Sequence, residues 1–292
     1  MKKIILPAIL LLAIFAYSDC KKQEKKTGRI TVVVSVFPLC DIARNISGDR
    51  ADVFFTIPAG ADPHTFEPRP SIAKDLQKAD LFIGVSKEFD GWLERYLPDT
   101  AVRTYLLDRS YRRDKPGNST IDTPNPHIWL SVRNAKNIAR STARYLSETD
   151  RKNKNYYDLN LTSYLKKLDE LDRSIALLYM NKKNKSFIQW HEAWYYFADD
   201  YGLAITGTVQ REGSDKASVR SIKEIIDRAK RDQVTVIVVG LSAEAGAARV
   251  LAGEIAGTVV PLDGIGTPQA GNRSDYLKLM YYNAKTLADA MR

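Results

Sequence analysis

The sequence predicts an α/β protein made of two βα lobes with parallel sheets, joined by a single long helix. Short runs rich in β-branched residues alternate with helical segments in both halves of the 292-residue chain. Such alternation favours parallel sheets whose faces are covered by helices. One long segment of helical periodicity separates the two alternating regions. These observations divide the body of the chain into an N-terminal lobe at residues 30–150, a connecting helix at 151–182 and a C-terminal lobe at 183–292.

The N-terminal lobe is expected to contain three buried strands and four helices. Each predicted strand is a compact apolar run bounded by turn residues or polar segments. The polar segment 109–125, which contains Pro116 and Gly117, is predicted to be a loop. The expected strands cover residues 30–36, 53–57 and 81–85, and the expected helices cover 39–47, 71–78, 88–97 and 134–148.

The connecting helix is predicted from the longest periodic segment of the chain. Its apolar residues recur at helical spacing and share one face. At about 1.5 Å per residue the segment is long enough to connect two lobes, and it has too few heptads to indicate a coiled coil. The residues on this face are Leu161, Tyr164, Leu165, Leu168, Leu171, Ile175 and Leu178.

The C-terminal lobe resumes the alternation of strands and helices. The strongly apolar run at residues 234–239 is typical of a strand buried on both faces. The expected strands cover residues 187–190, 203–209, 234–239 and 259–262, and the expected helices cover 221–231, 243–256 and 275–291.

The N-terminus is typical of an exported protein. Residues 1–19 are expected to be a signal peptide, because Lys2 and Lys3 precede a largely apolar run at residues 4–17. That run is too short to span a bilayer core comfortably. The body of the protein is therefore expected outside the cytoplasm, in the periplasm or at the cell surface.

The two cysteines agree with export. Cys20 follows the apolar run as in a bacterial lipoprotein signal, so residues 20–29 are expected to be a flexible leader lipidated at Cys20, which anchors the protein to the membrane. Tyr17 and Asp19 differ from the residues usual before such a cysteine, so an ordinary cleaved signal is the alternative. Cys40 is then left alone and is expected to pack as a small hydrophobe.

The charge distribution argues against a nucleic-acid-binding protein. Of the net charge of +9, residues 1–29 contribute +5 and the rest of the chain contributes +4. A mild surplus spread over a large body is typical of a solvated surface and not of a phosphate-binding stripe.

The chain has three histidines, His64, His127 and His191, and they are its candidate functional residues. By the predicted elements, His64, His191 and Asp263 each lie shortly after a strand, and ligands of open α/β sheets bind beyond the carboxyl ends of strands. The first two histidines belong to the first lobe, and the third histidine belongs with Asp263 to the second lobe. A site that uses all four lies in the cleft between the lobes.

Three imidazoles and one carboxylate suit Zn²⁺ and are acceptable to Mn²⁺. Any single histidine could instead be an ordinary core or surface residue, and Asp263 could belong to a simple turn after a strand. The joint placement of three of these residues near strand ends, with His127 following a loop, favours the metal site.

Several motifs occur in an order that resembles a known family. They are Ile57 to Pro68 around His64, Pro126-His127-Ile128-Trp129-Leu130, Trp190-His191-Glu192-Ala193, Pro261-Leu262-Asp263, and Asp275 to Asn283. Together they resemble the metal-binding proteins of ABC importers that take up zinc and manganese, the cluster A-I solute-binding lipoproteins. The resemblance covers nearly the whole mature chain.

The resemblance implies a non-enzymatic, extracytoplasmic solute-binding protein with a rigid connecting helix. It implies that His64, His127, His191 and Asp263 are the ligands of a transported Zn²⁺ or Mn²⁺. The implied partners are an ABC permease and, through the N-terminal lipid, a membrane, and the protein is expected to be a monomer.

Three departures from the family pattern bear on the metal site. Ser131 stands where the family usually has Asp, Gly240 stands where an acidic residue often follows a strand, and the loop at 109–125 has no histidine. The first two could weaken the contacts that hold the ligands in place. Many zinc-binding members of the family have a histidine-rich loop at the third position, so its absence makes the assignment of zinc over manganese less clear.

Two other functions remain open from the sequence. A secreted zinc-dependent hydrolase could use Glu192 as its base, but neighbouring residues of a helix do not face each other, and the HExxH spacing is missing. A surface adhesin with a structural metal predicts that removal of the metal unfolds the protein.

Overall fold

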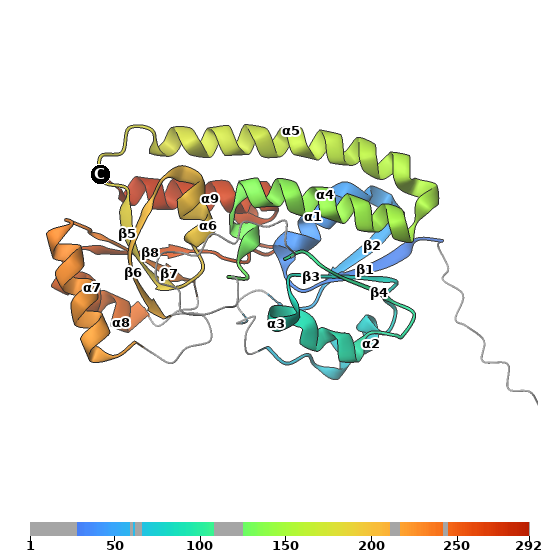
Figure 1. The fold of residues 1–292 in the computed structure, drawn as a ribbon, viewed down its shortest axis with the longest axis horizontal. Helices are drawn as coiled ribbons and strands as arrows, with labels where there is room; N and C mark the ends of the chain where they lie inside the picture. The colour runs from blue at the N-terminus through green and yellow to red at the C-terminus, as the bar shows by residue number, and fades with distance from the viewer. Residues whose placement is uncertain are drawn as a thin grey trace, which may run out of the picture.

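The computed structural model describes residues 28–58, 61, 66–107, 125–210, 217–241 and 245–291. Within these residues the chain forms two four-stranded parallel sheets that lie side by side, with helices above and below them (Figure 1). The predicted α/β fold with two parallel sheets and one long helix is confirmed. The predicted signal peptide, Cys20, His64 and most of the loop at 109–125 fall outside the described residues, and the predicted boundaries between lobes remain predictions.

The two sheets share one strand order, although the sequence shows no repeat by eye. The order is β2-β1-β3-β4 in the first sheet and β6-β5-β7-β8 in the second. The strands of the first are β1 (Ile30–Val34), β2 (Ala51–Phe55), β3 (Leu81–Gly84) and β4 (Val102–Tyr105). The strands of the second are β5 (Ser186–His191), β6 (Ala204–Gln210), β7 (Val236–Gly240) and β8 (Thr258–Leu262).

The helices form two layers, one on each face of the sheets (Figure 1). One layer contains α1 (Phe37–Ser47), α4 (Val132–Thr149), α5 (Lys154–Tyr179) and α9 (Tyr276–Ala290), with the short α6 (Tyr195–Tyr201) beneath it. The other layer contains α2 (Pro70–Leu76), α3 (Lys87–Asp90), α7 (Val219–Arg231) and α8 (Ala245–Glu254).

The long helix α5 lies over both sheets (Figure 1). Its 26 residues span about 39 Å at the ordinary helical rise. The apolar face predicted from the sequence faces the core. Leu161, Leu165 and Leu178 pack against the core half-buried. The buried residues of the helix are Tyr157, Tyr164, Leu168, Leu171, Ile175 and Tyr179. The helix therefore contributes to one core shared by both lobes.

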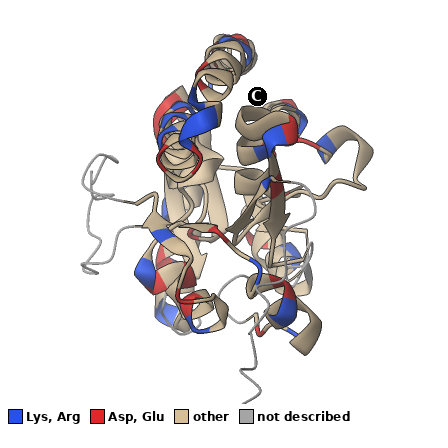
Figure 2. Ribbon diagram, turned by 90° about the vertical axis from the view of Figure 1, so that its right-hand side faces the viewer, with Lys and Arg blue, Asp and Glu red and all other residues tan. Residues whose placement is uncertain are grey.

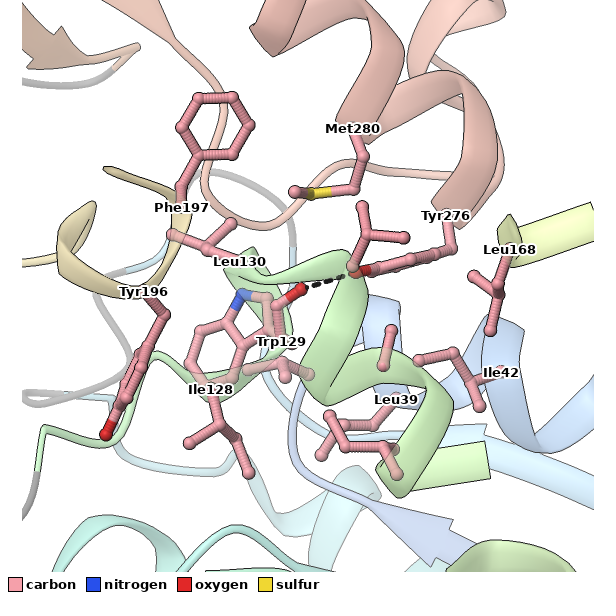
Figure 3. Close-up of a cluster of buried hydrophobic side chains, with 14 of the residues drawn as sticks. Leu39, Ile42, Ile128, Trp129, Leu130, Leu168, Tyr196, Phe197, Tyr276 and Met280 are labelled. Atoms are coloured by element: carbon pink, nitrogen blue, oxygen red, sulfur yellow. Dashed lines mark hydrogen bonds between the residues drawn. The ribbon is translucent and has the colours of Figure 1, made fainter. Parts of the chain in front are cut away.

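Trp129 lies where elements of the two lobes meet. Figure 3 shows it between the aromatic residues of α6 and the start of α9, with Leu39 and Ile42 of α1 nearby. The Tyr276 hydroxyl donates to the backbone oxygen of Trp129 at 2.8 Å. Trp129 is buried. The hydrogen bond therefore joins the segment after His127 to the C-terminal helix in the interior of the protein.

Two elements were not predicted, and one predicted helix was wrong in part. The edge strand β4 has the short, mostly half-buried pattern Val-Arg-Thr-Tyr, and α6 is an aromatic-rich helix that ends at Gly202 with φ of 62°. The helix expected at 88–97 is the single turn α3 followed by a 3₁₀ helix, Gly91–Tyr96.

The charges of the body are interspersed along the helices (Figure 2). Exposed pairs four residues apart, such as Lys154–Asp158 and Arg220–Glu224, are worth little to stability. Among the described residues, no helix has the length and apolar character needed to cross a membrane.

Cys40 packs as the sequence predicts. It is fully buried, its thiol donates to the backbone oxygen of Val53 at 3.7 Å, and burial raises its pKa to about 12. A thiol held neutral in this way is a poor nucleophile and a poor metal ligand.

Candidate metal centre

The candidate ligands come from the carboxyl ends of strands and from the segment before α4. His191 is the last residue of β5, and Asp263 directly follows β8. Both strands lie in the second sheet, where β5 and β8 flank β7. His127 precedes the 3₁₀ helix Ile128–Leu130, which leads into α4. The fold thus brings one candidate ligand from each half of the chain, His127 and His191, to a common place.

His127 and His191 face each other through their Nε2 atoms. The two nitrogens lie 3.4 Å apart, and the ring centroids are 5.1 Å apart at an angle of 81°. Two nitrogens bound to one tetrahedral Zn²⁺ at about 2.0–2.1 Å lie about 3.3–3.4 Å from each other. The observed separation therefore fits two imidazoles that share one zinc ion.

Asn125 orients His127 for such a role. Its Oδ1 accepts from the His127 backbone nitrogen at 2.9 Å and lies 2.9 Å from Nδ1 of the same residue. When Nδ1 carries the proton and donates to Asn125, the lone pair of the imidazole is on Nε2, the atom that faces His191.

Asn125 also ties the two histidine segments together. Its Nδ2 donates to the backbone oxygen of Glu192 at 2.7 Å, next to His191. The Tyr196 hydroxyl donates to the backbone oxygen of Asn125 at 3.0 Å. One amide side chain therefore couples the position of His127 to the end of β5.

Aromatic rings exclude water around His127, which is only 5% exposed. The ring centroids of Trp129 and Phe89 lie 5.4 Å and 6.5 Å from that of His127. Trp129 Nε1 donates to the backbone oxygen of Gly264 at 2.7 Å, so the Asp263 loop is attached to the same segment. A low-polarity surrounding strengthens the attraction between a cation and its ligands.

Asp263 is firmly held, but it does not complete a three-residue cluster. Its backbone nitrogen donates to Asn283 Oδ1 at 2.9 Å, and Asn283 Nδ2 donates to its backbone oxygen at 2.6 Å. In the described part of the chain, no group of three or more His, Cys, Asp or Glu side chains is close enough to hold a metal. The structure therefore brings together His127 and His191 of the predicted set.

Ser131 makes two hydrogen bonds in the scaffold, whereas nothing around Gly240 requires a glycine. Ser131 Oγ accepts from the Asn134 backbone nitrogen at 2.9 Å, which caps α4, and donates to Asp200 Oδ2 at 2.6 Å. Gly240 ends β7, and a Cβ added there meets nothing within 4 Å in the structure. The Ser131 hydroxyl supports the junction of α4 and α6, because Asp200 belongs to α6.

Burial raises the pKa of Asp200 to about 6, against the opposing hydrogen bond from Ser131. Burial likewise raises the pKa of Asp90 to about 6, although its carboxylate accepts from the backbone nitrogens of Val85 and Ser86. Both groups belong to the scaffold beneath the candidate ligands.

Sequence reasoning missed Asn125 and Arg273. Asn125 stands two residues before His127, so its position could have indicated a partner for the imidazole. Arg273 lies 3.2 Å from Asp263 Oδ2 through Nη1, and no sequence signal connects two residues that only the fold brings together.

The fold and the paired imidazoles define a two-lobed α/β protein of the metal-binding solute-binding class. The chain matches the family described as "Zinc-uptake complex component A periplasmic" over residues 32–290, and it belongs to this family. This is a family of transport proteins and not of enzymes, as the sequence predicted.

Curated relatives include both zinc and manganese proteins. The chain is 26% identical to the zinc-binding lipoprotein AdcA of Streptococcus pneumoniae, with 98% of this chain and 60% of that protein covered. It is also 26% identical to the manganese ABC transporter substrate-binding lipoprotein PsaA of Streptococcus mitis, with 100% and 99% covered. The high-affinity zinc uptake system protein ZnuA of Bacillus subtilis is 26% identical, with 99% and 96% covered. The periplasmic family and these lipoproteins agree with the predicted location outside the cytoplasm.

Solved structures share the fold. A deletion mutant of ZnuA with zinc bound has a TM-score of 0.80 at 27% identity, with 90% of this chain and 98% of that chain covered. A manganese-bound mutant of a periplasmic metal binding protein from candidatus liberibacter asiaticus has a TM-score of 0.82 at 20% identity, with 90% and 100% covered. At 20% identity, the similarity to the manganese-bound protein supports a shared fold only.

Proposed function

We propose that this protein captures Zn²⁺, with Mn²⁺ as the alternative, outside the cytoplasm and delivers it to an ABC permease. The proposed ligands are His64, His127, His191 and Asp263. The observation that carries the proposal is the 3.4 Å separation of the His127 and His191 Nε2 atoms, which fits two nitrogens on one zinc ion.

Capture by these residues needs no catalysis. Each imidazole must offer an unprotonated nitrogen and each carboxylate a negative oxygen, so the affinity falls as the pH is lowered. Ligands from both lobes enclose the ion, and the aromatic rings beside His127 keep the site from water.

The donor set favours zinc over manganese. Three imidazoles and one carboxylate match the preference of Zn²⁺ for nitrogen ligands, whereas Mn²⁺ prefers more oxygen. A zinc-binding lipoprotein and a manganese transport lipoprotein are both 26% identical to this chain. The preference for zinc therefore rests on the proposed ligands and not on sequence similarity.

The remaining parts of the proposal concern delivery. Cys20 is proposed as the site of a lipid that anchors a monomeric protein to the membrane, where it meets the permease. Residues 20–29 would act as a flexible tether between the lipid and the folded body, which begins at β1.

Competitive titration of metal-stripped protein with Zn²⁺ and Mn²⁺ against a chelator of known affinity tests the proposal. We expect one ion per chain and tighter binding of Zn²⁺. His191→Ala removes a direct ligand, so its loss should exceed the roughly 10- to 100-fold that outer partners of a metal site typically cost. Unchanged affinity in that variant would show that the ligand set is wrong.

The same samples separate the alternatives. Hydrolysis of a test ester or peptide by the zinc-loaded protein would support an enzyme. Unfolding of the protein on removal of the metal, together with normal metal uptake by cells that lack it, would support a surface protein with a structural metal.

A further inference from the structure

Arg273 lies against the carboxylate that we propose as the fourth ligand. It is the last residue of the 3₁₀ helix Gly271–Arg273, shortly before α9. Its Nη1 is 3.2 Å from Asp263 Oδ2, and the two side chains are only 22% and 12% exposed. This is a partly buried ion pair, which solvent screens less than a surface pair.

Only one oxygen of Asp263 remains for a metal. Oδ1 accepts from the backbone nitrogens of Ile265 at 3.1 Å and Gly266 at 2.8 Å. Asn283 holds the backbone of Asp263 on both sides. The carboxylate is therefore fixed with Oδ2 pointing away from its own loop, and Oδ2 is the oxygen that Arg273 contacts.

The Arg273 side chain is held in place by its neighbours. Its Cζ lies 5.2 Å from the centroid of the Tyr282 ring, and its Nε is buried without a hydrogen-bond partner in the described part of the chain. Its backbone packs against the Asp263 loop, since a Cβ on Gly266 would lie 3.1 Å from the Arg273 oxygen. The ion pair with Asp263 is thus the main compensation for a cation that has lost part of its water.

We propose that Arg273 competes with the captured metal for Asp263 Oδ2 and thereby lowers the affinity of the site. The inference rests on the proposed function. A guanidinium and a divalent cation repel each other, so a metal that takes this oxygen must displace Arg273. Capture exchanges an ion pair for a metal–oxygen bond, and release of the metal restores the ion pair. Arg273 is therefore an affinity-setting residue that acts through Asp263.

The test compares zinc dissociation constants of the wild-type protein and Arg273→Met, measured by chelator competition. Methionine keeps an apolar stem against Tyr282 and removes the charge. We expect about tenfold tighter binding and slower zinc release, the change expected for one charge-assisted hydrogen bond that the metal no longer has to break. Arg273→Lys keeps a positive charge and should stay close to the wild type.

A double-mutant cycle shows whether Arg273 acts through Asp263. In the background of Asp263→Asn, which has no carboxylate charge to compete for, Arg273→Met should raise the zinc affinity much less than it does in the wild-type background. Arg133→Met is the matched control, because Arg133 pairs with Asp200 at 3.7 Å and should not alter zinc binding. Circular dichroism of each metal-free variant verifies that it is folded.

The outcomes distinguish this inference from the proposed function. If the wild type binds one zinc and Arg273→Met binds it equally or more weakly, the competition is refuted while metal capture stands. An equal gain in the Asp263→Asn background would also refute action through Asp263. If the wild type binds no zinc, the proposed function itself fails.

Discussion

Replacement of Asn125 by Ala tests the link between the two imidazoles that face each other. The variant loses the Oδ1 acceptor of His127 Nδ1, so the ring can turn and its proton can move to Nε2. It also loses the 2.7 Å hydrogen bond from Nδ2 to the Glu192 oxygen. Both losses weaken the placement of the two Nε2 atoms at their 3.4 Å separation.

The size of the effect follows from the contacts that are lost. The side chain makes three hydrogen bonds, two to His127 and one to Glu192. At about 1 kcal/mol each, partly replaced by water at this half-buried position, their loss should lower the free energy of unfolding by about 2 kcal/mol. The zinc affinity should fall by about 10- to 100-fold, which is typical for partners that orient a ligating histidine.

Chelator competition measures the affinity, and urea unfolding of the metal-free protein measures the stability. Asn125→Asp retains an acceptor for Nδ1 but not the donor to Glu192, so its zinc affinity should stay within about tenfold of the wild type. Asn45→Ala is the matched control, because Asn45 is half-buried and bonds only within α1 among the described contacts. An unchanged zinc affinity in Asn125→Ala would refute the orienting role.

Three further predictions concern the scaffold beneath the site. Tyr276→Phe removes the hydroxyl that donates to the backbone oxygens of Trp129 at 2.8 Å and Ser131 at 3.2 Å, and urea unfolding should show a loss of about 1–3 kcal/mol; no loss would contradict the account. Tyr164→Phe removes a hydroxyl that is buried without a partner in the described part of the chain, so the same assay should show unchanged or slightly higher stability, and a large loss would be inconsistent with this. Burial raises the pKa of Asp200 from 3.8 to about 6, so the folded state holds this proton more tightly than the unfolded state. Its contribution to stability is complete below about pH 4 and is lost as the pH rises through 6, and relative to Asp200→Asn the wild type should lose about 3 kcal/mol over that range; parallel stability curves for the two proteins would rule this out.

The strands that the sequence predicts well are the ones buried on both faces. β1, β3 and β7 are nearly continuous apolar runs, with Thr31 as the one polar residue, because parallel strands covered by helices on both sides are buried on both faces. β4 was missed because it is an edge strand with one exposed and three half-buried residues. The expected helix at 88–97 divides at Asp90, whose φ of −131° and ψ of 7° are not helical, into one α-helical turn and a 3₁₀ helix.

In the candidate site too, the sequence indicates some residues by their position in the chain, whereas other contacts arise only in the folded protein. The position of His191 was predictable from its place after a strand, where open sheets bind their ligands, whereas His127 follows a loop and was joined to it by the ordered motifs of the family. The contacts of Asn125 with Glu192 and of Arg273 with Asp263 depend on how loops from different elements fold together. Such contacts follow no period and no local propensity, so a single sequence does not reveal them.

The central claim is that His127 and His191 bind the same metal ion, and a crystal structure of the zinc-loaded protein tests it most directly. Anomalous scattering at the zinc edge locates the ion without reference to any assumed ligand. We predict one peak about 2.0–2.1 Å from the Nε2 atoms of both His127 and His191, with His64 and Asp263 as the remaining ligands. A zinc peak that contacts neither histidine of this pair would contradict the account.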